Sequence, residues 1–138
     1  MRRARIAPSL LTLAFLPVVI AARAVQPPRA PKVVVVKAID VSPTEFKFEP
    51  AAITVLPGDT VRFTQTTATP HNVEFRAVPA GTNLGSAKMG PFLVAAGATY
   101  DVVIDARFAT GVHNYVCTPH EMMGMKGTIT VAPADATP

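Results

Sequence analysis

One short segment near the end of the chain concentrates side chains that bind soft metal ions. Cys117, His120 and Met125 supply a thiolate, an imidazole and a thioether within nine residues. A second imidazole, His71, opens an apolar segment much earlier in the chain. Two imidazoles and a thiolate with a weak axial thioether form the usual blue copper electron-transfer site. These four residues therefore predict one type 1 copper ion that alternates between Cu(I) and Cu(II).

Other chemistries fit the same residues less well. A structural zinc site would use further Cys or His ligands, and methionine is a poor zinc ligand. A cysteine nucleophile paired with histidine is the main catalytic alternative, but Cys117 and His120 lie in one short loop, and only Asn72 suggests an orienting group. We therefore expect no enzyme and no catalytic residues. His113 is interpreted as a surface or structural residue, and Met89 and Met122, taken singly, as core or gap-filling residues.

The N-terminus is typical of an exported protein. Basic residues at positions 2, 3 and 5 precede an apolar run over 10–20, and the run ends in Ala22-Arg23-Ala24. This layout predicts a signal peptide over 1–24 and a periplasmic or otherwise exported protein. A retained membrane anchor is the alternative, although the run is shorter than the roughly 20 apolar residues of a spanning helix. In an oxidising compartment the single cysteine, Cys117, needs protection, which metal coordination would supply.

The charge of the chain does not indicate a nucleic-acid partner. The formal net charge is +4, but four of the thirteen basic residues lie within the first 24 positions. The remaining nine are matched by nine acidic residues, so the rest of the chain is close to neutral. A polyanion-binding surface is therefore not expected.

Short β segments separated by turns must position the candidate ligands. Alternating or β-branched patterns predict strands at 33–36, 45–49, 53–55, 60–64, 72–75, 100–104, 113–117 and 128–131. Residues 77–97 are predicted to form a loop with one helical turn or an edge strand. We expect an all-β, antiparallel Greek-key sandwich of about seven or eight strands. Its domain would cover 33–131, between a Pro-rich linker over 25–32 and a disordered tail over 132–138.

Strand alternation also predicts which side chains share a face. His113, Tyr115 and Cys117 fall on one face of their strand, and His71 shares a face with Val73 and Phe75. If the apolar members of these sets fill the core, His71 and Cys117 meet at one end of the sandwich.

The segment Cys-Thr-Pro-His-Glu-Met-Met-Gly-Met-Lys-Gly over 117–127 resembles the copper loop of the cupredoxins, in particular plastocyanins and pseudoazurins. The family pattern is Cys, two residues, His, four residues, Met. The segment over 70–73, Pro-His-Asn-Val, resembles the family's upstream ligand segment. Further similar pieces are Phe46-x-Phe48-x-Pro50, 53–63 and 127–131, so the resemblance extends over most of 44–131.

The resemblance implies a role for each matching residue. His71 and His120 would be the imidazole ligands, Cys117 the thiolate and Met125 the long axial ligand. Met123 competes for the axial position because it has the shorter spacing of amicyanin-like loops, but glycines at 124 and 127 favour Met125. Asn72 would join the two ligand segments by hydrogen bonds near the Cys117 sulfur.

The resemblance also implies a function: an exported carrier of single electrons. Its partners would be redox proteins such as cytochromes or copper and haem oxidoreductases, which bind it transiently. We expect a monomer with no nucleic-acid partner and with membrane contact only if the leader is retained. Val116 replaces the aromatic residue common in plastocyanins, and no acidic cluster is present, so a respiratory or denitrifying partner is as open as a photosynthetic one. The alternative function is a periplasmic copper carrier, storage or assembly module.

Overall fold

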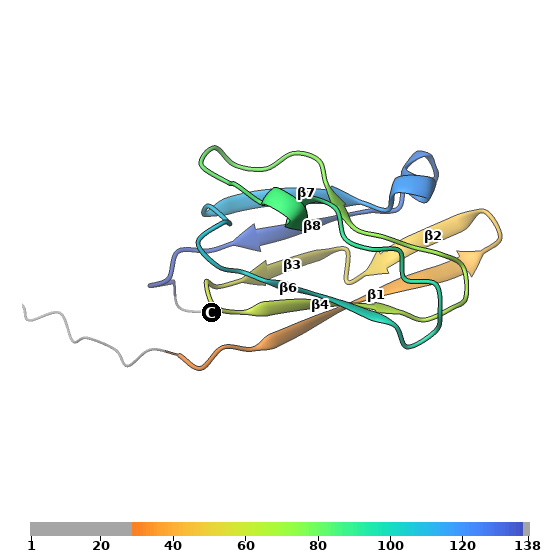
Figure 1. The fold of residues 1–138 in the computed structure, drawn as a ribbon, viewed down its shortest axis with the longest axis horizontal. Helices are drawn as coiled ribbons and strands as arrows, with labels where there is room; N and C mark the ends of the chain where they lie inside the picture. The colour runs from red at the N-terminus through yellow and green to blue at the C-terminus, as the bar shows by residue number, and fades with distance from the viewer. Residues whose placement is uncertain (1–28, 137–138) are drawn as a thin grey trace, which may run out of the picture.

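Residues 29–136 are described by the structure, a computed structural model. Within them, eight strands form two four-stranded sheets that pack face to face (Figure 1). The first sheet has the order β2–β1–β4–β6 and the second β3–β8–β7–β5. This confirms the predicted all-β sandwich. The bounds are β1 (Val33–Ser42), β2 (Glu45–Glu49), β3 (Ala52–Val55), β4 (Thr60–Gln65), β5 (Glu74–Phe75), β6 (Thr99–Val103), β7 (Gly111–Val116) and β8 (Lys126–Val131), with 3-10 helices η1 (Gly85–Lys88) and η2 (Thr118–Met123).

Four of the six strand pairs in the described residues are antiparallel, as expected: β1–β2, β4–β6, β5–β7 and β7–β8. The other two pairs, β1–β4 and β3–β8, are parallel. Parallel pairing arises because the chain crosses between layers. After the β1–β2 hairpin it enters the second sheet as β3 and returns to the first as β4, beside β1.

The core lies between the sheets and follows the alternation of the strands. In β2, Phe46 and Phe48 are buried while their charged neighbours face solvent. Phe48, Phe63 and Tyr115 pack edge to face, with ring centroids 4.9 to 6.0 Å apart. Tyr115 lies so close to the β8 backbone that a Cβ at Gly127 would overlap its ring. This packing fixes β7, the strand that leads to Cys117.

The predicted alternation along β7 is confirmed: His113, Tyr115 and Cys117 are all fully buried. The His113 ring lies 3.2 Å from Thr82 Oγ1 and 3.3 Å from the Gly111 carbonyl oxygen, at the end of β7 away from Cys117. Burial lowers the pKa of His113 and so favours the neutral ring. The interpretation of His113 as structural agrees with these contacts.

The long segment between β5 and β6 contains the predicted single helical turn, η1. Two isolated β-bridges, His71 with Leu93 and Glu74 with Met89, join this segment to β5, the edge strand of the second sheet, and to the residues just before it. The segment therefore supports the backbone on which His71 lies.

Some predictions about the chain ends lie outside the described residues. The predicted signal peptide, 1–24, and the first part of the predicted linker fall in this category. The domain limits stay predictions. Between residues 29 and 136, no helix is long and apolar enough to cross a membrane.

A buried carboxylate, Asp59, fixes the turn between β3 and β4. It is 1% exposed and accepts hydrogen bonds from the backbone N–H groups of Leu56 (3.0 Å) and Lys32 (2.8 Å). Arg29 pairs with it at 2.6 Å. Burial opposes ionisation, but these hydrogen bonds and the Arg29 charge outweigh burial and hold the pKa of Asp59 below its ordinary 3.8. The carboxylate therefore stabilises the fold in its ionised form.

We predict that Asp59→Asn lowers the free energy of unfolding by about 1–3 kcal/mol at neutral pH, because charge-assisted hydrogen bonds are lost. A group with a depressed folded-state pKa contributes its full stabilisation above its unfolded pKa and loses it as the pH falls through the folded value. We would measure the free energy of unfolding of the wild type and of Asp59→Asn in urea over a pH series. The difference between the two free energies should become smaller below the ordinary pKa of 3.8. A difference that stays constant through the acid range would contradict this assignment.

Candidate metal centre

Three potential ligand atoms from two distant segments converge at one end of the sandwich. The Cys117 Sγ lies 3.4 Å from His71 Nδ1 and 3.4 Å from His120 Nδ1, and the two Nδ1 atoms are 3.0 Å apart. His71 and Cys117 are buried, while His120 is partly exposed. The structure thus brings three of the four predicted ligand residues into contact.

Local backbone structure places each of the three. His71 precedes β5 and exchanges two backbone hydrogen bonds with Leu93 (3.2 and 2.7 Å). Cys117 directly follows β7, and η2 carries His120. The end of η2 requires Gly124, whose φ of 86° lies in the left-handed region. This turn returns the chain so that β8 can begin beside β7.

Met125 closes the loop at the same point. Its carbonyl accepts a hydrogen bond from the Cys117 N–H at 3.0 Å, and its own N–H donates to the His120 carbonyl at 3.2 Å. Its side chain is fully buried in the same apolar cluster as Cys117. Met123, the competing candidate, is 51% exposed. Burial therefore favours Met125 over Met123 as the axial thioether.

The electrostatics of the three atoms suit a cation. Burial raises the pKa of the Cys117 thiol, although the N–H groups of Asn72 and His120 oppose the rise. Burial and the nearby His71 lower the pKa of His120 more than the charge of Asp40 raises it, which favours the neutral ring. A proton on one of these three atoms can form a hydrogen bond to only one of the other two at a time. A metal ion can bind all three atoms at once and stabilises the thiolate form of Cys117. The donor set therefore fits a soft-ligand metal site.

Comparison with known proteins agrees with this geometry. The model of the copper-binding proteins of the plastocyanin/azurin family matches residues 35–132. The chain belongs to this family. Plastocyanin from Scenedesmus fuscus is 38% identical over 86 residues, which are 61% of this chain and 85% of that one. Pseudoazurin from Methylobacterium extorquens AM1 has a similar structure, with a TM-score of 0.52, 31% identity, and coverage of 72% of this chain and 75% of that chain.

Plastocyanin from Prochlorothrix hollandica is 39% identical over 84 residues, which are 61% of this chain. The match covers 62% of that plastocyanin, less than two thirds of its length. Membership of the plastocyanin/azurin family, together with the His, Cys, His and Met side chains at one end of the sandwich, supports one type 1 copper ion as the cofactor.

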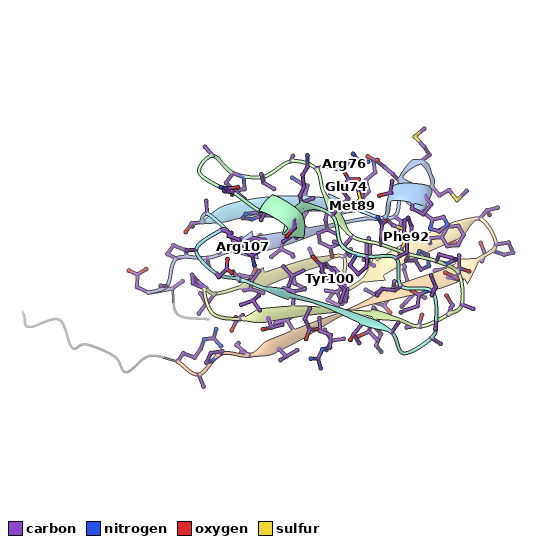
Figure 2. All side chains as sticks on the ribbon, in the orientation of Figure 1. Glu74, Arg76, Met89, Phe92, Tyr100 and Arg107 are labelled. Carbon is purple, nitrogen blue, oxygen red and sulfur yellow. The ribbon has the colours of Figure 1, made fainter. Side chains whose placement is uncertain are left out.

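Asn72 joins the two segments of this cupredoxin site, as the resemblance implied. Its side-chain oxygen accepts the Thr118 N–H at 2.8 Å, and its amide donates to Thr118 Oγ1 at 3.0 Å. Thr118 Oγ1 in turn donates to Glu74 at 3.2 Å. Arg76 pairs with Glu74 and with Glu121 of η2, both at 3.0 Å, and Figure 2 shows Glu74 and Arg76 next to each other. One hydrogen-bonded chain thus fastens the Cys117 loop to β5.

Two contacts of the histidines were not predicted from the sequence. Phe46 stacks on the His120 ring with centroids 3.9 Å apart and planes 22° from parallel. Asp40 Oδ1 lies 2.7 Å from His71 Nε2, the ring nitrogen that points away from Cys117. Burial alone would raise the pKa of Asp40, but hydrogen bonds from Thr69, His71 and Thr67 outweigh burial and hold the pKa of this carboxyl below its ordinary value.

The sequence held only a weak signal for these two residues. Phe46 belongs to a segment that resembles the family, but the resemblance gave it no role at the site. Asp40 lies between two apolar residues, Ile39 and Val41, and no local pattern connects it with a histidine 31 residues later.

We predict that Asn72→Ala destabilises the metal-free protein by about 1–3 kcal/mol, because it removes both hydrogen bonds between the buried Asn72 side chain and Thr118. The free energy of unfolding from urea titration measures this loss. Asn114→Ala is the matched control, since Asn114 is exposed on β7, and its effect should be within about 0.5 kcal/mol. Equal effects of the two substitutions would show that Asn72 does not join the two segments energetically.

Proposed function

We propose that this protein is an exported type 1 copper protein that carries single electrons between redox partners, and that His71, Cys117, His120 and Met125 are the copper ligands. The observation that carries the proposal is the convergence of two Nδ1 atoms and one Sγ within 4.8 Å of one another, at the point where Met125 is buried. Membership of the plastocyanin/azurin family supports it.

When bound, copper supplies a one-electron couple between Cu(II) and Cu(I). The residues around the site keep the ligand atoms in one arrangement for both states. Asn72 and Thr118 fix the Cys117 loop, and the Met125 backbone binds both Cys117 and His120. Little movement of the ligands favours fast electron exchange, because a preorganised site need not rearrange when its charge changes.

His120 is the proposed route by which electrons enter and leave. It is the partly exposed member of the ligand set, and exposed apolar side chains follow it in η2. Met122 is 97% exposed and Met123 51%. Phe92, next to the bridge partner of His71, is 53% exposed and lies at the same end of the molecule (Figure 2). We call the surface formed by Phe92, Pro119, Met122 and Met123 the apolar rim.

A partner would dock on the apolar rim weakly and briefly. Electron-transfer encounters bury less than about 1,200 Å², so the complex separates after one electron has moved. Cytochromes and copper or haem oxidoreductases are the proposed partner classes. The leader pattern over 1–24 supports export. In this proposal the protein carries electrons and performs no catalysis of its own.

The first experiment adds one equivalent of Cu(II) to the purified protein and records its visible spectrum. We expect an intense blue band that disappears with ascorbate and returns on reoxidation, because a thiolate bound to Cu(II) in a trigonal site absorbs strongly. A colourless protein that retains Cu(I) would instead favour a copper carrier, storage or assembly module. A protein that binds no copper would contradict both functions.

Variants assign the ligands in the same measurement. Cys117→Ser should abolish the blue band, and a band that persists would overturn the ligand assignment. Met125→Ala and Met123→Ala form a matched pair that decides the axial ligand. The first should change the spectrum, whereas the second should leave it as in the wild type. The opposite result would assign Met123 to the axial position.

We further predict that Met122→Lys slows electron exchange with a redox partner about tenfold or more, because it places a charge on the apolar rim. Stopped-flow kinetics with a soluble c-type cytochrome would measure the rate. Val103→Lys is the control, since Val103 is 46% exposed. It pairs with Thr60 at the start of β4, whereas the candidate metal site lies at the other end of the sheet, where Asp40 near the β1–β2 turn contacts His71. A changed spectrum with unchanged kinetics would show that Met122 belongs to the metal site and not to a docking surface.

A further inference from the structure

The structure assigns Asp40 as a positioning residue of the metal centre: its carboxylate holds the His71 ring and, by its charge, favours Cu(II) over Cu(I). This inference rests on the proposed function, because it concerns the same four ligands. It adds a residue of β1, which lies outside both ligand segments, 70–73 and 117–127.

Both nitrogens of the His71 ring are engaged, which fixes its orientation. Nε2 lies 2.7 Å from Asp40 Oδ1, and Nδ1 faces Cys117 Sγ at 3.4 Å. The ring is 1% exposed, so water does not compete for Nε2. Because an ionised carboxylate can only accept, this hydrogen bond requires the proton on Nε2, and in the neutral ring Nδ1 then has a free electron pair for the metal.

Asp40 is itself held in place. Its second oxygen accepts a hydrogen bond from Thr69 Oγ1 at 2.5 Å, two residues before His71. On the other side, the β1–β2 pairing shifts register between Asp40 and Ser42, and such irregularities redirect side chains at the end of a strand pair. Asp40 lies opposite Phe46 in this register, the residue that stacks on His120. The β1–β2 hairpin therefore contacts both imidazoles, each in a different way.

The two contacts have different electronic consequences. A carboxylate on the N–H of a ligating imidazole makes the opposite nitrogen a stronger donor. A negative charge near the metal also stabilises the more highly charged ion, Cu(II), relative to Cu(I). Among the described residues His120 has no such partner: its side-chain polar contacts both use Nδ1, and one face of its ring is covered by the apolar Phe46 ring. The preference for Cu(II) thus depends on the His71 side of the site.

A purely structural role of Asp40 predicts a different result from a positioning role. If Asp40 served only to join β1 to the His71 segment, its loss would lower the stability of the fold and weaken both oxidation states of copper equally. A positioning role instead separates the two oxidation states. The ratio of the Cu(II) and Cu(I) affinities, which determines the reduction potential, therefore distinguishes a positioning role of Asp40 from a purely structural one.

The test compares Asp40→Asn with Asp101→Asn in the full chain. Each substitution removes one negative charge, but Asp101 pairs with Arg62 on the outer face of the sheet. We expect Asp40→Asn to keep a blue site while its Cu(II) affinity falls about ten- to a hundredfold and its Cu(I) affinity falls less, so that its reduction potential rises. The Asp101→Asn protein should keep the wild-type potential. Equilibrium redox titration and competition with Cu(I) and Cu(II) chelators measure these quantities.

A second measurement needs no substitution and no metal. Nitrogen-15 NMR of the metal-free wild-type protein reports which ring nitrogen of His71 carries a proton, and we expect Nε2 to be protonated at neutral pH. An unprotonated Nε2 would overturn the inference. Equal potentials for the two Asp→Asn proteins beside a blue wild type would overturn the inference alone, whereas a wild type that never turns blue would overturn the proposed function and this inference with it.

Discussion

Three electron-rich atoms, His71 Nδ1, Cys117 Sγ and His120 Nδ1, lie 3.0 to 3.4 Å from one another, and the rest of the structure must hold them there. These atoms hold one another only weakly, because a shared proton satisfies one of their contacts at a time. His71 and Cys117 are 46 residues apart in the chain. Their proximity therefore depends on the pairing of β5 with β7 and on the Asn72 and Thr118 hydrogen bonds that extend this pairing into the loop.

The same frame gives the two imidazoles different surroundings. His71 is enclosed, bound through its backbone to Leu93 and through its ring to Asp40. His120 is partly exposed on a short 3-10 helix, with Phe46 stacked against one face of its ring. An enclosed and charged side of the site suits control of the oxidation state. An exposed side bordered by methionines suits exchange with a partner. Both follow because one imidazole comes from within the sandwich and the other from a surface loop.

The sequence predicted the features that are local in the chain. The bounds of β2 follow from the alternation of phenylalanine and charge over 45–49, and the inward set of β7 follows from strand parity. The metal-binding loop was recognisable because its ligand types lie within nine residues. β5 is shorter than its predicted range, 72–75, because only Glu74 and Phe75 pair with β7. His71, just before that range, instead forms an isolated bridge with Leu93.

Features that depend on neighbours in space were not predicted. An alternating pattern indicates that a strand forms but not which strand lies beside it, so the parallel pairs β1–β4 and β3–β8 had no sequence signal. The carboxylate of Asp40 reaches His71 only because β1 ends beside the segment that follows β4. The buried carboxylate of Glu74 is a similar case, since its burial depends on Thr118 and Arg76 from elsewhere at the site's edge. The burial of such polar groups can be explained only when their hydrogen-bond partners are known, and these partners are distant in the sequence.

The residue before Cys117 limits where electrons can pass in the proposed function. Val116 is 4% exposed and pairs with Glu74 of β5 and Lys126 of β8, so it offers neither an aromatic ring nor an open surface beside the thiolate. Tyr115, the next aromatic residue along β7, is fully buried among Phe48, Phe63 and Phe75 and does not reach solvent. Of the proposed ligands, His120 is the one that reaches the surface. A partner that exchanges electrons with this protein must therefore approach over the apolar rim, and its own contact surface should be apolar at the centre, with few charges opposite Met122.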